Sequence, residues 1–284
     1  MSEFAEEIIG TLRNAGLECR LSEGTLLSIV CRCARSGKEV RIAPLDVCAR
    51  TLEEALAQQA LASEAILGWQ GEDGEYPLVV TSDRWRRSNG MMKARLLSHV
   101  ELHRSIFARD CTVRRIDKIT AREFLERCHS YGYASGKHHL GLFVARSRKE
   151  LTEGELVAVA TFSSARRWIK GGKEIHSFEW TRYSSLPSVR VTGGMGKILK
   201  AFIEEKNPDD IMSYSDLEWS EGKVYEQLGF VCEGVKAPVS FEVNPLDWSR
   251  KAIGKTSPEA IPSEEKLYFT NFGSRKYRLK LTEY

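Results

Sequence analysis

The residues best suited to chemistry in this chain form a glycine-rich turn between a strand-like segment and an amphipathic helix. The run reads Val189-Arg190-Val191-Thr192-Gly193-Gly194-Met195-Gly196-Lys197-Ile198-Leu199-Lys200. The three glycines carry no Cβ, so a ligand can approach the backbone closely. The first N–H groups of a helix have no partner within it and lie at the positive end of its dipole. The turn therefore predicts an anion site, most naturally for a phosphate.

A second informative segment follows farther along the chain, Lys223-Val224-Tyr225-Glu226-Gln227-Leu228-Gly229-Phe230. It reads as a short helix that ends at a glycine, after which an aromatic residue begins another strand.

The elements around these segments alternate between strands and helices from residue 108 onward. Periodicity predicts strands at 111–116, 138–145, 155–162, 174–183, 211–215 and 230–233, with helices at 120–128 (capped by Thr120), 196–205 and 222–228. Before them we expect helices at 4–15 and 51–67, strands at 26–31, 39–43 and 76–81, and a basic helix at 88–104. Residues 247–265 read as a loop before a strand-like tail at 276–281. This order predicts a small α+β domain with a basic connecting helix at 1–105, a mixed α/β domain at 106–245 and a C-terminal extension at 246–284.

Composition sets broad limits on function. The 284 residues carry a net charge of only +3, so bulk electrostatics gives no case for nucleic-acid binding. Seven scattered cysteines, without a CxxC pair, favour a reducing compartment and no metal site; Cys31 and Cys33 would share one strand face. An acidic start and the lack of a long apolar run favour a soluble, cytoplasmic protein. The sequence leaves the oligomeric state open.

The element order, the glycine turn and the Tyr225–Phe230 segment together resemble the GNAT superfamily of acyl-coenzyme A-dependent N-acyltransferases, over roughly residues 108–240. The resemblance implies a mixed, mostly antiparallel sheet flanked by helices, with acetyl-coenzyme A or another acyl-coenzyme A as cofactor. It also implies that Arg190 to Lys197 hold the pyrophosphate. Gly194 and Gly196 match the family's glycines, whereas Val191 stands where the family has Gln or Arg, and Arg190 lies one residue earlier.

Shorter segments resemble narrower groups. Phe107–Cys111, Gly141–Phe143, Leu156–Phe162 and Ser213–Asp216 are similar to phage-associated GNAT-like proteins, in which the acyltransferase-like part follows a nuclease-like domain. The N-terminal unit lacks a convincing pair of metal-binding carboxylates, which favours a degenerate or purely binding domain. His129-Ser130-Tyr131 is similar to a motif of Mom-like proteins, GNAT relatives that modify adenine in DNA.

Acyl transfer to an amine needs a base for the amine proton and an acid for the departing thiolate. The resemblance makes Tyr225 the candidate acid, and a packing tyrosine is the alternative. Glu179 and Asp216 are the candidate bases, although Glu179 could instead pair with Arg182 or Arg166.

The remaining candidates lie where the resemblance places the acceptor site. His129 is a further catalytic candidate, with a capping or solvent-facing histidine as the alternative, and Tyr131, Arg166 and Trp168 are candidate acceptor contacts.

Three functions remain open at this point. The chain could be an N-acyltransferase with an unidentified amine acceptor, a phage or mobile-element protein that modifies or binds DNA through its basic helix, or a recognition module that has lost its cofactor. Intact Tyr225 favours the first, and Val191 favours the third.

Overall fold

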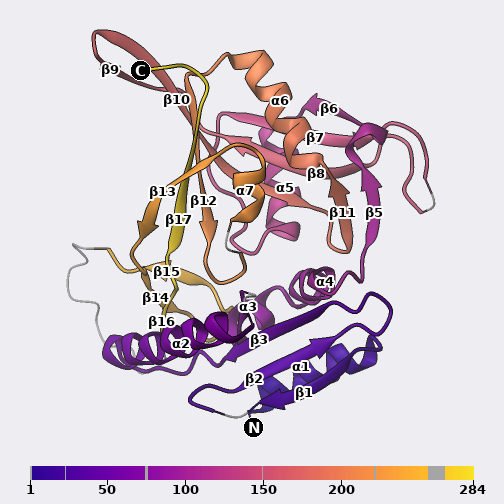
Figure 1. Cartoon of the computed structure of the whole chain (residues 1–284), viewed down its shortest axis with the longest axis vertical. Helices are drawn as coiled ribbons and strands as arrows, with labels where there is room; N and C mark the ends of the chain where they lie inside the picture. Colours follow the sequence, from indigo (N-terminus) through magenta and orange to yellow (C-terminus); the bar gives the residue numbers. More distant parts are fainter. Residues whose placement is uncertain (1, 23, 74–75, 149, 221, 255–265) are drawn as a thin grey trace. The chain divides into compact units, whose positions relative to one another are not determined.

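The computed structural model describes residues 2–22, 24–73, 76–148, 150–220, 222–254 and 266–284 (Figure 1). Its contacts divide the chain into two compact units. Unit 1 comprises Met1–Glu101, Ser215–Glu221 and Val235–Arg275, and unit 2 comprises Leu102–Tyr214, Gly222–Gly234 and Lys276–Tyr284. Each unit therefore draws on separate stretches of chain. The domain bounds 1–105, 106–245 and 246–284 expected from the sequence stay a prediction.

Unit 1 contains a four-stranded sheet and a three-stranded sheet with helices beside them. The larger sheet has the order β1-β2-β3-β4, and the smaller one β15-β14-β16. The bounds are α1 (Glu3–Asn14), β1 (Glu18–Ser22), β2 (Ser28–Arg32), β3 (Glu39–Leu45), α2 (Leu52–Asp73), β4 (Leu78–Thr81), α3 (Ser82–Arg87), α4 (Asn89–His99), β14 (Ser240–Val243), β15 (Arg250–Ala252) and β16 (Leu267–Thr270). Ile66 of α2 packs in one apolar cluster with Val79 of β4 and Phe269 of β16, so both sheets share a core.

A cluster of buried charges lies in unit 1. Arg84 contacts the carboxylate of Glu218 at 2.5 Å and that of Asp216 at 3.5 Å. Arg250 holds Asp83 through two hydrogen bonds and lies 3.6 Å from Glu218. The side chains of Asp83 and Glu218 are fully buried. Burial raises the pKa of Glu218 to about 7, against the attraction of Arg84.

We expect the free energy of unfolding to fall as the pH rises from about 4.5 to about 7. In this range the Glu218 carboxyl of the folded state holds a proton that the unfolded chain has released. Glu218→Gln should remove that part of the pH dependence. Urea unfolding of both proteins across this range measures the difference. Parallel curves for the two proteins would mean that Glu218 does not titrate in this window.

Unit 2 is built on one mixed sheet with the strand order β13-β17-β12-β10-β8-β7-β6, and β9 pairs with β10. A separate parallel pair joins β5 and β11. The bounds are β5 (Arg104–Phe107), a 3-10 turn η1 (Ala108–Asp110), β6 (Cys111–Arg115), α5 (Lys118–Cys128), β7 (His138–Val144), β8 (Leu156–Phe162), β9 (Arg166–Lys170), β10 (Lys173–Ser185), β11 (Val189–Thr192), α6 (Gly194–Lys206), β12 (Asp210–Asp216), α7 (Lys223–Gln227), β13 (Val231–Lys236) and β17 (Ser274–Lys280).

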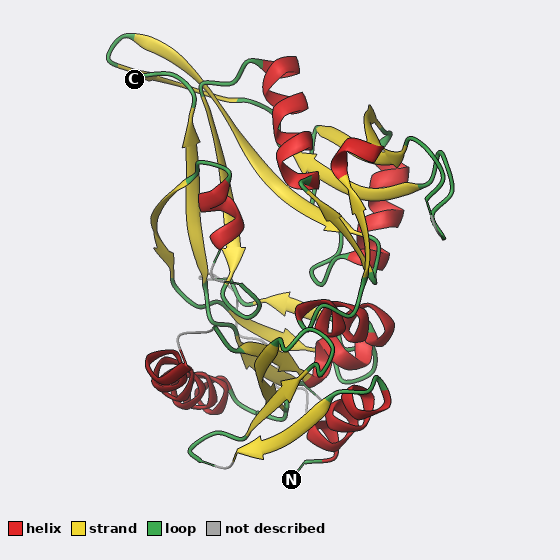
Figure 2. Ribbon diagram, turned by 45° about the vertical axis from the view of Figure 1, so that its right-hand side comes forward, coloured by secondary structure: helices red, strands yellow, loops and turns green. Residues whose placement is uncertain are grey.

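Helices cover both faces of this sheet (Figures 1 and 2). Phe124 of α5 packs on Val159 of β8, whereas Phe202 of α6 stacks on Phe162 of the same strand at 3.8 Å. Val159 and Phe162 lie on opposite faces because side chains alternate along a strand. The β6–β7, β7–β8, β8–β10 and β9–β10 pairs are antiparallel. The predicted fold class, a mixed and mostly antiparallel sheet flanked by helices, is confirmed.

Several predicted elements differ from the structure. The helix expected at 88–104 is present as α4, which ends at His99, before residue 104 begins β5. The helix expected from Thr120 begins at Lys118, and Asp117 caps it by accepting a hydrogen bond from the Thr120 N–H. The sequence also missed β1, β14 and β16. Part of the loop expected at 247–265 lies outside the described residues, and Arg250–Ala252 forms β15.

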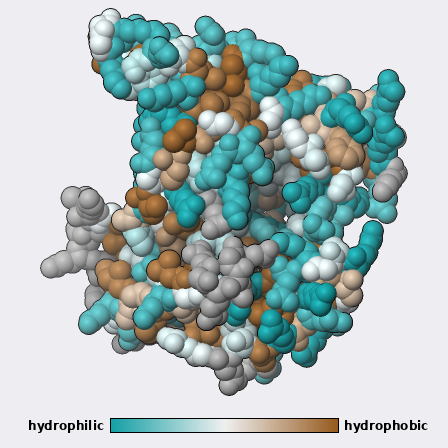
Figure 3. Space-filling view, in the orientation of Figure 1, coloured by the Kyte–Doolittle hydropathy of each residue, from teal (hydrophilic) through white to brown (hydrophobic). Residues whose placement is uncertain are grey.

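Three arginines at and just before the helix expected at 88–104 make contacts within unit 1. Arg84 is buried in the charge cluster, Arg86 stacks over Trp248, and Arg95 stacks over Trp219. Figure 3 shows hydrophilic residues over most of the face that it draws. Among the described residues, no helix is long and apolar enough to span a membrane.

Candidate active site

The glycine turn joins β11 to α6 and exposes its backbone. Gly193 caps the helix with a φ of 76°, a left-handed conformation that glycine adopts without strain. Thr192 and Gly193 are exposed. The N–H groups that follow, in the first turn of α6, have no acceptor within the helix. The local structure thus presents backbone donors at an accessible helix start.

The other two glycines of the turn lie close to neighbouring side chains, which leave little room for a Cβ atom. A Cβ on Gly194 would lie 2.6 Å from the Tyr183 hydroxyl and 3.0 Å from a methyl of Val191, which is too close. A Cβ on Gly196 would lie 3.3 Å from a methyl of Leu228. The first turn of α6 is therefore in contact with the residue that follows α7, and α7 carries Tyr225.

The side chains of the turn are divided between the core and the surface. Val191 is 7% exposed and belongs to the core of unit 2, whereas Arg190 is exposed on the other side of β11. Lys197 turns its ammonium group to the backbone carbonyls of Ala108 and Cys111. Met195 is half-buried. Val191 and Lys197 thus serve packing and local hydrogen bonding in this structure.

Arg109 is a cation beside the turn that the sequence analysis did not select. Phe107 is the register partner of Thr192, and Ala108 lies 3.6 Å from the position of a Cβ on Gly193. The Arg109 guanidinium stacks over the Phe107 ring at 4.7 Å and is exposed. The segment Phe107–Cys111 contributed to the family resemblance, but β5 and its pairing with β11 were not predicted.

Strands β10 and β12 are parallel neighbours over a short distance only. Their register runs from Ser177 opposite Asp210 to Trp180 opposite Ser213, and the pairing ends there although both strands continue. At the same place the pairing of β10 with β8 shifts register between Trp180 and Arg182. The sheet is thus irregular on both sides of Trp180.

Tyr225 lies where the two strands part. The Ser213 hydroxyl is 2.9 Å from the Tyr225 phenol oxygen and 2.9 Å from the Trp180 carbonyl oxygen. The Tyr225 ring stacks on Tyr277 at 5.2 Å and meets Phe230 edge-on. These contacts fix the phenol next to the last paired residues of β10 and β12. Ser213 is a site residue that the sequence analysis missed.

The environment of Tyr225 keeps its phenol protonated. Burial raises the pKa of Tyr225 above its ordinary value, which outweighs the opposing effects of the Ser213 hydrogen bond and the Arg182 charge. Burial likewise raises the pKa of Tyr183. At neutral pH the Tyr225 phenol is therefore protonated.

Glu179 lies on the other face of the sheet. Its neighbours Phe178 and Trp180 pack in the core beside α6, so strand alternation directs Glu179 to the α5 face. Its carboxylate is 25% exposed and lies 3.7 Å from Arg166 of β9. The sequence suggested an ion pair of Glu179 with Arg182 or Arg166, and the pair with Arg166 is present in the structure.

His129 and Tyr131 follow α5, and Arg182 links their loop to β10. The Arg182 guanidinium donates to the Gly132 carbonyl at 3.2 Å and lies 5.9 Å from the Tyr131 ring centre. His129 accepts a hydrogen bond from the Tyr131 N–H through Nδ1. The structure therefore brings this loop next to the irregular part of β10. Arg182 was considered in the sequence only as a partner of Glu179.

Two further candidate site residues, Asp216 and Trp168, contact other partners. Asp216 contacts Arg84 and accepts a hydrogen bond from the Glu218 N–H, so its carboxylate belongs to the charge cluster of unit 1. Trp168 contacts the ring of Tyr284 edge-on at 5.6 Å. Trp168 is not in contact with Tyr225 or with the glycine turn among the interactions of the described residues.

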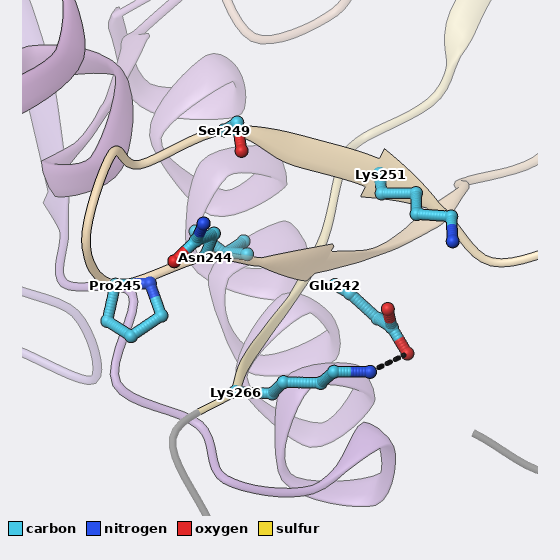
Figure 4. Close-up of a pocket in the computed structure, with 7 residues that line it drawn as sticks. Glu242, Asn244, Pro245, Ser249, Lys251 and Lys266 are labelled. Carbon is cyan, nitrogen blue, oxygen red and sulfur yellow. Dashed lines mark hydrogen bonds and ion pairs between the residues drawn. The ribbon is translucent and has the colours of Figure 1, made fainter. Parts of the chain in front are cut away.

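A pocket of about 370 Å³ in unit 1 contains none of the predicted site residues. Its wall includes Asn244, Ser249 and Lys251, and Glu242 there pairs with Lys266 at 3.2 Å (Figure 4).

No family model and no curated protein sequence match the chain. Solved structures with a similar course of the chain include a "histone acetyltransferase HPA2 and related acetyltransferase" from Corynebacterium glutamicum, at 11% identity and a TM-score of 0.38, covering 62% of this chain and 98% of that one. A "probable N-acyltransferase" of unknown function from Enterococcus faecalis has 12% identity and a TM-score of 0.34, covering 49% of this chain and 36% of that one.

A mutant AtaT toxin bound to the C-terminus of the antitoxin AtaR and acetyl-coenzyme A has 13% identity and a TM-score of 0.28, covering 57% of this chain and 93% of that one. The solved structures that resemble this chain thus include acetyltransferases. At these values the similarity carries no chemistry across to this chain.

Proposed function

We propose that the chain is an acyl-coenzyme A-dependent N-acyltransferase whose reaction takes place in unit 2. One observation carries the proposal: the Tyr225 phenol lies where the pairing of β10 and β12 ends, on an element that contacts the first turn of α6. A proton donor and a helix start with accessible amides are thus neighbours, as transfer from a phosphate-bearing thioester requires.

The glycine turn would hold the pyrophosphate of the coenzyme. The left-handed Gly193 is exposed, and the first amides of α6 that follow it are donors without an acceptor in the helix. Arg109 adds the positive charge that Val191 does not supply. When bound, the coenzyme supplies the activated acyl group as a thioester.

Tyr225 would donate the proton that the departing thiolate needs. Ser213 has one proton and two oxygens within hydrogen-bond distance. When its hydroxyl turns to the phenol oxygen, the phenol proton is free to be donated, and the same hydrogen bond stabilises the phenolate that forms.

Glu179 would accept the proton of the amine, approaching from the α5 face. It is partly exposed, and Arg166 holds it at a distance that leaves the carboxylate accessible. Tyr131 and His129 lie on the same face and would contact the acceptor. We prefer Glu179 to Asp216 because the latter is engaged by Arg84. Donor and acceptor would then meet where the two strands are unpaired.

Arg109→Ala should weaken the binding of acetyl-coenzyme A about tenfold, since one charge-assisted hydrogen bond contributes about 1.5 kcal/mol or more. Isothermal titration calorimetry measures this effect. The matched control is Arg122→Ala, which removes an exposed arginine that stacks on Tyr133 in the same way but lies on α5. Equal affinities in all three proteins would exclude Arg109 from the coenzyme site.

A further inference from the structure

Two cysteines of unit 1 face each other across neighbouring strands. Cys19 of β1 and Cys31 of β2 are register partners in an antiparallel pair. Their Sγ atoms are 2.8 Å apart, and both residues are free thiols. Cys33, which shares the strand alternation of Cys31, lies beyond the end of β2 in the turn that Gly37 closes. The close partner of Cys31 is therefore Cys19.

The backbone at this pair suits a disulfide without rearrangement. Residues directly opposite each other on antiparallel strands have Cα atoms about 4.5 to 5.5 Å apart. A disulfide spans Cα separations of about 4.4 to 6.8 Å. Rotation of the two side chains is thus enough to join the sulfur atoms.

The two thiols differ in their surroundings. Cys31 is fully buried, whereas Cys19 is partly exposed and lies next to Arg13, whose guanidinium donates to the Cys19 carbonyl at 3.3 Å. The hydrogen bond with Cys31 lowers the pKa of Cys19, and the Arg13 charge adds to this effect against partial burial. The same hydrogen bond and burial raise the pKa of Cys31. Cys19 is the more accessible nucleophile, and Cys31 is placed to resolve it.

We propose that Cys19 and Cys31 are a redox modification site that hydrogen peroxide oxidises to an intramolecular disulfide. The Cys19 thiolate attacks one peroxide oxygen, the O–O bond breaks, and the leaving hydroxide takes up a proton as water. The sulfenic acid of Cys19 is then attacked by the Cys31 sulfur, the S–O bond breaks, and a second water leaves with the Cys31 proton. Two electrons pass from the dithiol to the peroxide. This site is independent of the acyltransferase proposal.

The disulfide would fix an edge strand. β1 pairs with β2 and, within the part of the chain that the structure describes, has no second neighbour in its sheet. The link would close the loop between the two strands and so hold β1 in register. Oxidation should therefore slow backbone hydrogen exchange in β1.

Peptide mapping of the full chain tests the proposal. The reduced protein is treated with a single equivalent of hydrogen peroxide, the remaining thiols are alkylated, and trypsin then places Cys19 in peptide 14–20, Cys31 in 21–32 and Cys33 in 33–35. We expect peptides 14–20 and 21–32 to be linked, with the loss of two hydrogen atoms. Linkage should be about tenfold faster than oxidation of the exposed single thiols Cys48 and Cys232.

Three variants separate the roles of the sulfur atoms. In Cys31→Ser, the sulfenic-acid reagent dimedone should label Cys19, whereas in Cys19→Ser it should leave Cys31 unlabelled. Cys33→Ser is the matched control and should retain the link. The proposal would be overturned if Cys19 and Cys31 are still alkylated after Cys48 and Cys232 have been oxidised. A link from peptide 21–32 to peptide 33–35 would also overturn it. Peptide mapping of the unaltered chain tests the proposal even if a variant fails to fold.

Discussion

Tyr225→Phe should reduce the release of coenzyme A from acetyl-coenzyme A about 100-fold or more, the usual contribution of a positioned general acid. The ring contacts with Tyr277, Phe230 and Trp180 do not need the hydroxyl, so the variant should keep its fold. Affinity for acetyl-coenzyme A should change little, because the loss arises in the transition state. Thiol release, followed with a panel of primary amines, measures the rate.

Tyr268→Phe is the matched control, since Tyr268 belongs to β16 in unit 1 and its hydroxyl is not part of the proposed site. It should leave the rate unchanged. Ser213→Ala should give a smaller loss than Tyr225→Phe, because the phenol remains while the bond that stabilises its anion is removed. Equal rates for Tyr225→Phe and the unaltered protein would remove Tyr225 from the mechanism.

Arg84→Ala should lower the free energy of unfolding by about 3 to 5 kcal/mol, because it removes one partner of a buried ion pair and takes away the cation nearest to Glu218. Arg84 holds Glu218, which has no exposed side-chain surface, and also contacts Asp216. Urea unfolding at neutral pH measures the loss. Arg87→Ala, at an exposed position of the same helix, should change stability by less than about 0.5 kcal/mol.

The pair Arg84→Met and Glu218→Leu should restore much of the stability that Arg84→Ala loses, because a buried ion pair can be replaced by apolar side chains of similar volume. The contact of Arg250 with Asp83 remains in that double variant. A loss below about 1 kcal/mol for Arg84→Ala would mean that the cluster does not depend on this pair.

Apolar periodicity predicted those helices and strands whose own residues carry the pattern. The helices of residues 3–14 and 194–206 and the hairpin of β7 and β8 follow directly from apolar periodicity, and they are present. β1, β14 and β16 were missed because their pairing partners, rather than their own alternation, hold them in place.

Residues whose roles depend on distant partners were harder to interpret. Arg84 lies just before the basic helix expected at 88–104, but its partner Glu218 lies 134 positions away. Arg109 comes to lie beside the glycine turn only through the pairing of β5 with β11. Tyr225 could be singled out because a family motif contains it, whereas the Ser213 contact depends on how β12 lies beside α7.

Hydrogen–deuterium exchange of the intact chain with and without acetyl-coenzyme A tests the central claim most directly. A coenzyme held by the first amides of α6 must slow their exchange, because it accepts their hydrogen bonds. We expect protection in peptides that cover 192–198, accompanied by protection around Ser213 and Tyr225. Unchanged exchange in these peptides at millimolar acetyl-coenzyme A, or protection confined to unit 1, would contradict the proposed acyltransferase site.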